Sequence, residues 1–174
     1  MRKKVEKYEY IRIADIYIKA ACNADHIACL IDILKYENIL VTITSAEKQS
    51  FPFRKLEHNE AKYKITKEYM ITHENISYVD VVLIASPNCL KKLLNDIFEC
   101  NIEMITLLNI NEACLWEECF EYIKEKKCTG RDMIKAKLSD VFFTAGIYEC
   151  GIGITLNKTV YNVRQIAAQV KELF

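Results

Sequence analysis

The first part of the chain alternates segments with strand and helix patterns. Residues 11–18 alternate apolar residues with polar or small ones and are β-branched at the apolar positions, which predicts a strand. From about residue 23 to 36, apolar residues recur at spacings of three and four and predict an amphipathic helix. Residues 39–44 form a short apolar, β-branched run that predicts a second strand. The start of the chain therefore predicts a β-α-β unit.

The central part continues this alternation. Residues 79–85 are almost continuously apolar, as expected of a parallel strand that is buried on both faces. Helical spacing follows over 90–98, a strand is predicted over 102–107, and another helix over about 112–126. The polar stretch 47–75 carries only a weak strand signal. We therefore expect an α/β fold, a three-layer Rossmann-like parallel sheet with helices on both faces.

The last part of the chain has a different pattern of short helical and extended segments. A short helix is predicted to end near Lys137, and two extended segments, 141–144 and 151–155, follow it around a turn at Gly146. A final helix with a one-sided apolar face is predicted to follow a cap at Thr159.

This change in the sequence pattern predicts two parts of the chain. Residues 1–128 are expected to form the Rossmann-like α/β domain. Residues 129–174 are expected to form a C-terminal helical and hairpin appendage that packs on the domain or on a partner subunit.

Composition narrows the classes of function. The 174 residues suit one domain, and the 51% of hydrophobic residues excludes wholesale disorder. Lys plus Arg and Asp plus Glu both number 24, so no net field attracts nucleic acid or anionic membranes. No apolar run approaches the ~18 residues of a membrane-spanning helix, and the first ten residues lack the apolar segment of a signal peptide. We expect a cytoplasmic protein that binds neither nucleic acid nor membrane.

The eight cysteines suggest one alternative chemistry. Cys22, His26 and Cys29 are spaced by four and three residues, which places them on one face of a helix, as metal ligands require. The same face carries apolar side chains, and no CxxC pair occurs in the sequence. Core packing is therefore favoured over metal binding, and we predict no metal site.

Polar residues directly after predicted strands are the candidates for ligand binding. In open α/β sheets, ligands bind outside the carboxyl ends of the strands. Thr44 and Ser45 carry hydroxyls that can donate to a phosphate, and Phe51 can pack on a ring. Ser86 and Asn88 follow the third strand. In both places the alternative is a helix cap. No GxGxxG or P-loop motif is present, so standard NAD or FAD binding is not expected.

The segments 41–46 and 79–88, with Phe51 shortly after the first, resemble a family of flavoproteins that includes FMN-dependent cysteine decarboxylases. The final helix and hairpin resemble the ends of some flavoproteins that are encoded with bacterial microcompartments. The resemblance covers roughly two-thirds of the chain.

This resemblance implies FMN bound at a subunit boundary of a homo-oligomer, with redox or decarboxylase-type activity. Ser45 would lie near the FMN phosphate, and Thr44 and Phe51 would also belong to the cofactor site. Ser86 and Asn88 would lie near the isoalloxazine ring or the substrate, and Asn88 would be the catalytic residue.

Two other hypotheses stay open. In the first hypothesis, the chain is a non-catalytic protein-interaction or scaffold subunit with a degenerate Rossmann-like fold. Such a subunit would bind a protein partner through its C-terminal helix. In the second hypothesis, the chain binds a nucleotide or coenzyme A without a glycine-rich motif.

Overall fold

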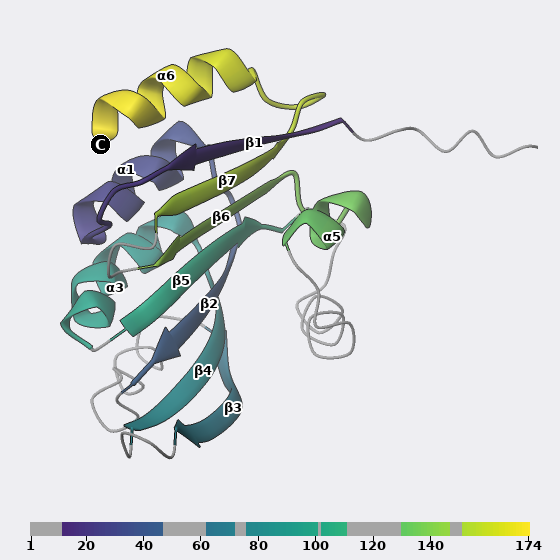
Figure 1. Cartoon of the computed structure of the whole chain (residues 1–174). Coiled ribbons are helices and arrows are strands. Elements are labelled where there is room, and N and C mark those ends of the chain that lie inside the picture. Colours follow the sequence, from purple (N-terminus) through teal and green to yellow (C-terminus); the bar gives the residue numbers. More distant parts are fainter. Residues whose placement is uncertain (1–11, 47–61, 72–75, 101, 111–129, 147–150) are drawn as a thin grey trace, which may run out of the picture.

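The structure is a computed structural model that describes residues 12–46, 62–71, 76–100, 102–110, 130–146 and 151–174 (Figure 1). The strands are β1 (Ile13–Ile18), β2 (Ile39–Ser45), β3 (Lys62–Ile71), β4 (Ile76–Ala85), β5 (Ile102–Asn109), β6 (Val141–Gly146) and β7 (Ile152–Asn157). The helices are α1 (Ala24–Ile33), α3 (Pro87–Glu99), α5 (Gly130–Lys135) and α6 (Val163–Leu173). The helix expected over 112–126 lies outside the described residues.

The described strands form one seven-stranded sheet in the order β1-β7-β6-β5-β2-β4-β3. Every neighbouring pair in this sheet is antiparallel. The expected parallel, Rossmann-like sheet is therefore wrong, although most of the expected strands and helices exist.

The error lies in which strands are neighbours. β4 and β5 both pair antiparallel with β2, so these two strands run in the same direction and are connected by α3. β1 and β2 also run in the same direction and are joined by α1, with three strands between them. Each β-α-β unit therefore does connect two strands that run in the same direction. The two strands are not neighbours, because strands from other parts of the chain lie between them in the sheet and run in the opposite direction.

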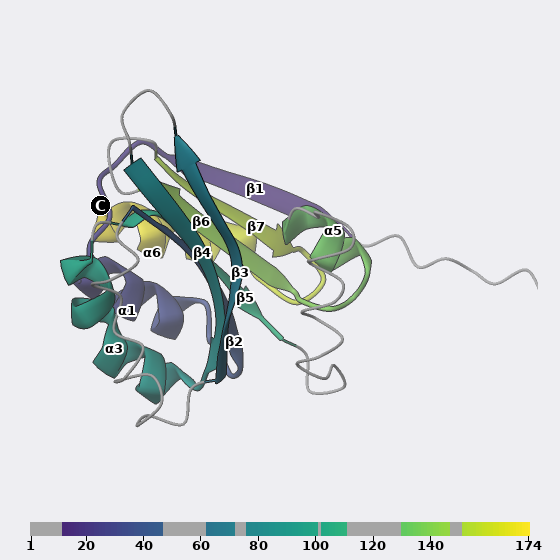
Figure 2. The same ribbon diagram turned by 90° about the horizontal axis from the view of Figure 1, so that it is seen from below.

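Helices α1, α3 and α6 cover one face of the sheet, whereas α5 lies on the other face (Figure 2). α1 lies in the middle of this layer and contacts both α3 and α6. The side chains that α1 and α3 bury against the sheet include Ile27, Leu30 and Leu93. Burial of each such side chain contributes about 1.5–3 kcal/mol, so the helix-covered face holds the main core.

A second, smaller cluster explains why 79–85 is so apolar. Val81 and Leu83 of β4 face the helices, whereas Val82 packs on the opposite face with Leu40 and Met133. The apolar run is thus buried on both sides, as the sequence predicts. The helix layer covers one side of this run and α5 packs on the other, so burial on both sides does not require parallel pairing.

The expected C-terminal appendage contributes to the same sheet and core. β6 and β7 lie between β5 and β1, and α6 buries Ile166 and Val170 in the main core. The final helix starts later than expected, because Asn162 caps it by accepting from the backbone N–H of Gln165. Thr159 instead donates its hydroxyl to Asn157 at 2.7 Å.

Two tyrosines connect α1 and the turn after it to the rest of the core. The Tyr36 hydroxyl donates to the carbonyl of Leu107 at 3.0 Å, and the Tyr161 hydroxyl donates to the carbonyl of Leu34 at 3.1 Å. Burial raises the pKa of Tyr161 to about 12, and the nearby Asp140 adds to this rise. Burial also raises the pKa of Tyr36 well above its ordinary value. Both tyrosines therefore favour the folded state only while they are protonated.

The Tyr161 pKa predicts a loss of stability in alkali. The unfolded state releases this proton near pH 10 and the folded state near pH 12, so the free energy of unfolding falls across that interval. We expect Tyr161→Phe to lower stability by about 1 kcal/mol at pH 8, through the lost hydrogen bond, and to flatten the decline between pH 10 and 12. Urea unfolding followed by circular dichroism measures both effects. The exposed Tyr17, changed to Phe, is the control, and equal slopes in all three proteins would contradict the assignment.

Candidate functional site

The described residues that were expected to hold FMN lie at opposite ends of β2. Ser45 is opposite Val79 at the start of β4, whereas Ser86 follows Ala85, which is opposite Ile39 at the start of β2. The length of β2 separates the two ends by about 20 Å along the strands. The expectation that the carboxyl ends of these strands meet is therefore wrong, because β2 and β4 are antiparallel.

The individual side chains also have structural roles. Thr44 donates its hydroxyl to Asp80 at 2.7 Å, and Ser45 is fully buried. Ser86 is the N-cap of α3 and accepts from the backbone N–H of Cys89 at 3.3 Å. Asn88 is exposed in the first turn of the same helix. For Ser86, the structure therefore contains the helix cap that was the alternative to ligand binding. Phe51 lies outside the described residues.

Cys22, His26 and Cys29 are not gathered around one point. Cys22 is buried before α1, Cys29 is exposed, and the His26 ring contacts Phe174 with 4.4 Å between ring centroids. No group of three or more His, Cys, Asp or Glu residues in the described ranges is placed to hold a metal ion. Burial raises the pKa of the Cys22 thiol to about 12, although a hydrogen bond to the Asn23 backbone opposes this rise. Cys22 is therefore a protonated, apolar core residue at neutral pH.

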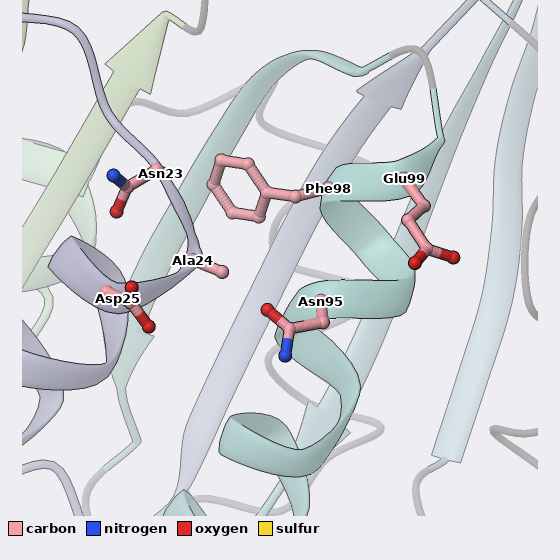
Figure 3. A pocket seen from close by; sticks show the side chains of 6 residues that line it. All are labelled: Asn23, Ala24, Asp25, Asn95, Phe98 and Glu99. Carbon is pink, nitrogen blue, oxygen red and sulfur yellow. The ribbon is translucent and has the colours of Figure 1, made fainter.

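A hollow of about 440 Å³ lies between the start of α1 and the end of α3 (Figure 3). Its lining residues are Asn23, Ala24, Asp25, Asn95, Phe98 and Glu99. Figure 3 shows the Phe98 ring reaching from α3 toward the loop that precedes α1. Asn23 caps α1 through a 2.9 Å bond from the His26 N–H, so its carboxamide oxygen is already used. The lining contains two carboxylates and two amides around an aromatic ring, but no nucleophile beside a base.

The sheet face opposite the main helix layer carries a band of small and polar side chains. The cross-strand register places Thr42, Thr106, Thr144, Gly153 and Tyr17 in one row across five strands. The hydroxyls of Thr42 and Thr106 are hydrogen-bonded to each other. Beyond the apolar cluster under α5, the described side chains of this face are mainly small or polar, and Thr106 among them is buried.

The Tyr17 ring lies close to Gly151, which directly precedes β7. A Cβ atom on Gly151 would lie 2.4 Å from the Tyr17 hydroxyl oxygen and 2.7 Å from its ring carbon Cζ. Gly151 also has a φ of +88°, which side-chain-bearing residues rarely adopt. The absence of a side chain at this position lets the tyrosine ring lie along the sheet.

Two exposed apolar side chains lie on the same face as this row, on β1 and β5. The large apolar residues that are exposed in the described ranges are Tyr17 (69%), Met104 (44%) and Val160 (58%). Tyr17 and Met104 alternate with the buried residues Ile16 and Ile105, so both lie on the open face. The sequence analysis did not single out these residues. The Gly-x-Gly at 151–153 was the available signal, since glycines two apart in a strand mark a close approach of another group.

Comparisons with known proteins do not assign the chain to a family. No protein-family model matches the chain, and neither a curated protein nor a solved structure matches it. In the described part of the chain, no helix is both long enough and apolar enough to cross a membrane.

The contact between Tyr17 and Gly151 predicts a specific coupling. We expect Gly151→Ala to destabilise the protein by about 1–3 kcal/mol, because the new methyl group meets the Tyr17 ring and the backbone has positive φ. Tyr17→Ala should recover part of this loss in the double variant, since only the collision is removed. Urea unfolding of the two single variants and the double variant measures the coupling energy.

Gly153→Ala is the matched control for this cycle. Its Cβ would lie 3.3 Å from Thr144 Cγ2 and would not meet Tyr17. We expect a smaller loss that Tyr17→Ala does not change. Strict additivity of Gly151→Ala and Tyr17→Ala would show that the ring does not lie over this glycine.

Proposed function

We propose that this chain is a non-catalytic protein-interaction subunit that associates with itself through the part of the sheet that carries Tyr17. The observation that carries the proposal is the position of Tyr17, which is 69% exposed on the open face and supported from below by Gly151. An exposed tyrosine contributes a large contact area, and tyrosine is enriched in interfaces. Met104 and the threonine row extend this surface.

The other residues support a binding role over an enzymatic one. The hydroxyl-bearing residues after β2 and β4 are about 20 Å apart and serve the fold, and the hollow between α1 and α3 lacks a nucleophile paired with a base. The net charge of zero imposes no overall repulsion between copies.

The C-terminal helix is not proposed as the binding element. Its apolar side, which includes Ile166 and Val170, packs against the main core of its own chain. Removing α6 would therefore expose this core, and the effect on assembly would be indirect.

Self-association provides the direct test of this function. We expect the protein to dimerise measurably in sedimentation velocity at micromolar concentrations, and Tyr17→Ser to raise the dissociation constant at least about tenfold. Val160→Ser is the control, because Val160 is similarly exposed but lies in the turn before α6. A protein that stays monomeric at all concentrations, or equal weakening by both substitutions, would contradict the proposal.

FMN binding stays a prediction of the family resemblance and has its own test. A ligand present at 100 times its dissociation constant stabilises a protein by ~2.7 kcal/mol, which raises Tm by several degrees. The family resemblance predicts such a rise in Tm with FMN and a flavin absorption band in the purified protein, whereas the non-catalytic interaction subunit proposed above predicts neither. A rise that Ser45→Ala and Ser86→Ala both abolish would favour the flavoprotein hypothesis instead.

A further inference from the structure

We propose that α6 is a strap over the main core, which opens as a unit while the rest of the protein stays folded. Figure 1 shows α6 at the border of the helix layer, beside α1 and β1. Opening removes Ile166 and Val170 from the main core and uncovers an apolar surface that the closed protein hides. This inference goes beyond the proposed function and does not rest on it, because α6 and Tyr17 lie on opposite faces of the sheet.

Both ends of α6 are attached to α1. The hydroxyl of Tyr161, just before α6, donates to the carbonyl of Leu34, the C-cap of α1, at 3.1 Å. At the other end, the Phe174 ring contacts the ring of His26 in the first turn of α1, with 4.4 Å between the centroids. α6 therefore lies antiparallel along α1, and one contact holds each of its ends.

The middle of α6 is less deeply anchored than the other helices of its layer. Ile166 and Val170 are the buried residues among its 11. α3 buries four side chains among 13 residues, and α1 buries three among 10. Segments with few buried apolar side chains open at a lower free-energy cost than the core of a domain. Opening of α6 alone is therefore easier than opening of α1 or α3.

The attachment at His26 is the weaker of the two. In the described part of the chain, its Nδ1 is the one buried side-chain nitrogen or oxygen atom without a hydrogen-bond partner. A buried polar atom that has lost water and gained no partner costs free energy. Phe174 packs on this imidazole, so its departure returns the nitrogen to water. Opening therefore begins at this end, whereas the hydrogen bond of Tyr161 holds the other end.

An opened α6 does not remain a helix. Helices shorter than about 12–15 residues are only marginally stable alone in water, and α6 has 11 residues. Leaving the core thus breaks the backbone hydrogen bonds of α6, and its amide hydrogens then exchange with solvent. Native-state hydrogen exchange therefore measures this opening directly, and α1 of the same molecule is the internal reference.

The wild-type protein provides the first test. We expect the protection factors of the Val170 and Lys171 amides to be at least about tenfold lower than those of Leu30 and Ile31 in α1. Low concentrations of urea should change the exchange of α6 little, since a local opening exposes little surface. Equal protection and equal urea dependence in the two helices would show that α6 opens only with the whole protein, which overturns the proposal.

Two substitutions at position 26 test the weaker attachment. His26→Phe keeps an aromatic ring against Phe174 but contains no nitrogen to bury, so we expect it to raise the protection factors of α6 at least about threefold. His26→Ala is the matched variant that removes the ring contact, and it should lower them. Protection in α6 that His26→Phe leaves unchanged or lowers would overturn the assignment of this end as the weaker one.

Phe174→Ala keeps the test decisive in case His26→Phe fails to fold, because it leaves α1 and the sheet unchanged. We expect it to lower the protection factors of Val170 and Lys171 at least about fivefold and to leave those of Leu30 and Ile31 unchanged. Circular dichroism and thermal unfolding establish that each variant is folded before exchange is compared. Equal losses of protection in both helices would mean that α6 is an inseparable part of the core, and the strap would be refuted.

Discussion

The structure depends on one packing constraint, which is that a single helix layer buries one face of an antiparallel sheet. α1 contacts α3 on one side and α6 on the other, and the side chains of β1, β2, β4, β5, β6 and β7 that point toward this layer are almost all apolar and buried. The opposite face receives only α5 among the described helices, so it is apolar near Leu40 and Leu108 and becomes polar toward Thr42 and Thr44. The described helices thus bury one face of the sheet far more completely than the other.

Local sequence patterns could predict the elements but not their neighbours. The alternation in 11–18 and the helical spacing before 36 report which side chains face the core, and both elements are present as β1 and α1. Which strand lies next to β2 is decided by side-chain packing between segments more than 30 residues apart, and no local pattern contains that information. The continuous apolar run in β4 was interpreted as parallel pairing, whereas it reports only burial on both sides.

The candidate site was less predictable than the fold, for a related reason. Ser86 has the sequence signature of a helix cap as well as of a ligand contact, and the hydrogen bond to the Cys89 N–H decides in favour of the cap. Tyr17 looks in the sequence like any outward residue of an alternating strand. Its position becomes apparent only when β7 is placed beside β1, because its ring then lies close to Gly151.

The distribution of glycines reflects the packing around β7. The chain has only 4 glycines in 174 residues, and none occurs before Gly130. Two of them lie at or in β7, the strand on which β1 rests, although glycine weakens a strand by leaving its backbone uncovered. The Tyr17 ring lies close to Gly151, so it covers part of the backbone that this glycine leaves bare. Gly153 is instead next to Thr144 of β6, where a Cβ would lie 3.3 Å from the threonine Cγ2. The two glycines therefore make room for side chains of the two strands that flank β7.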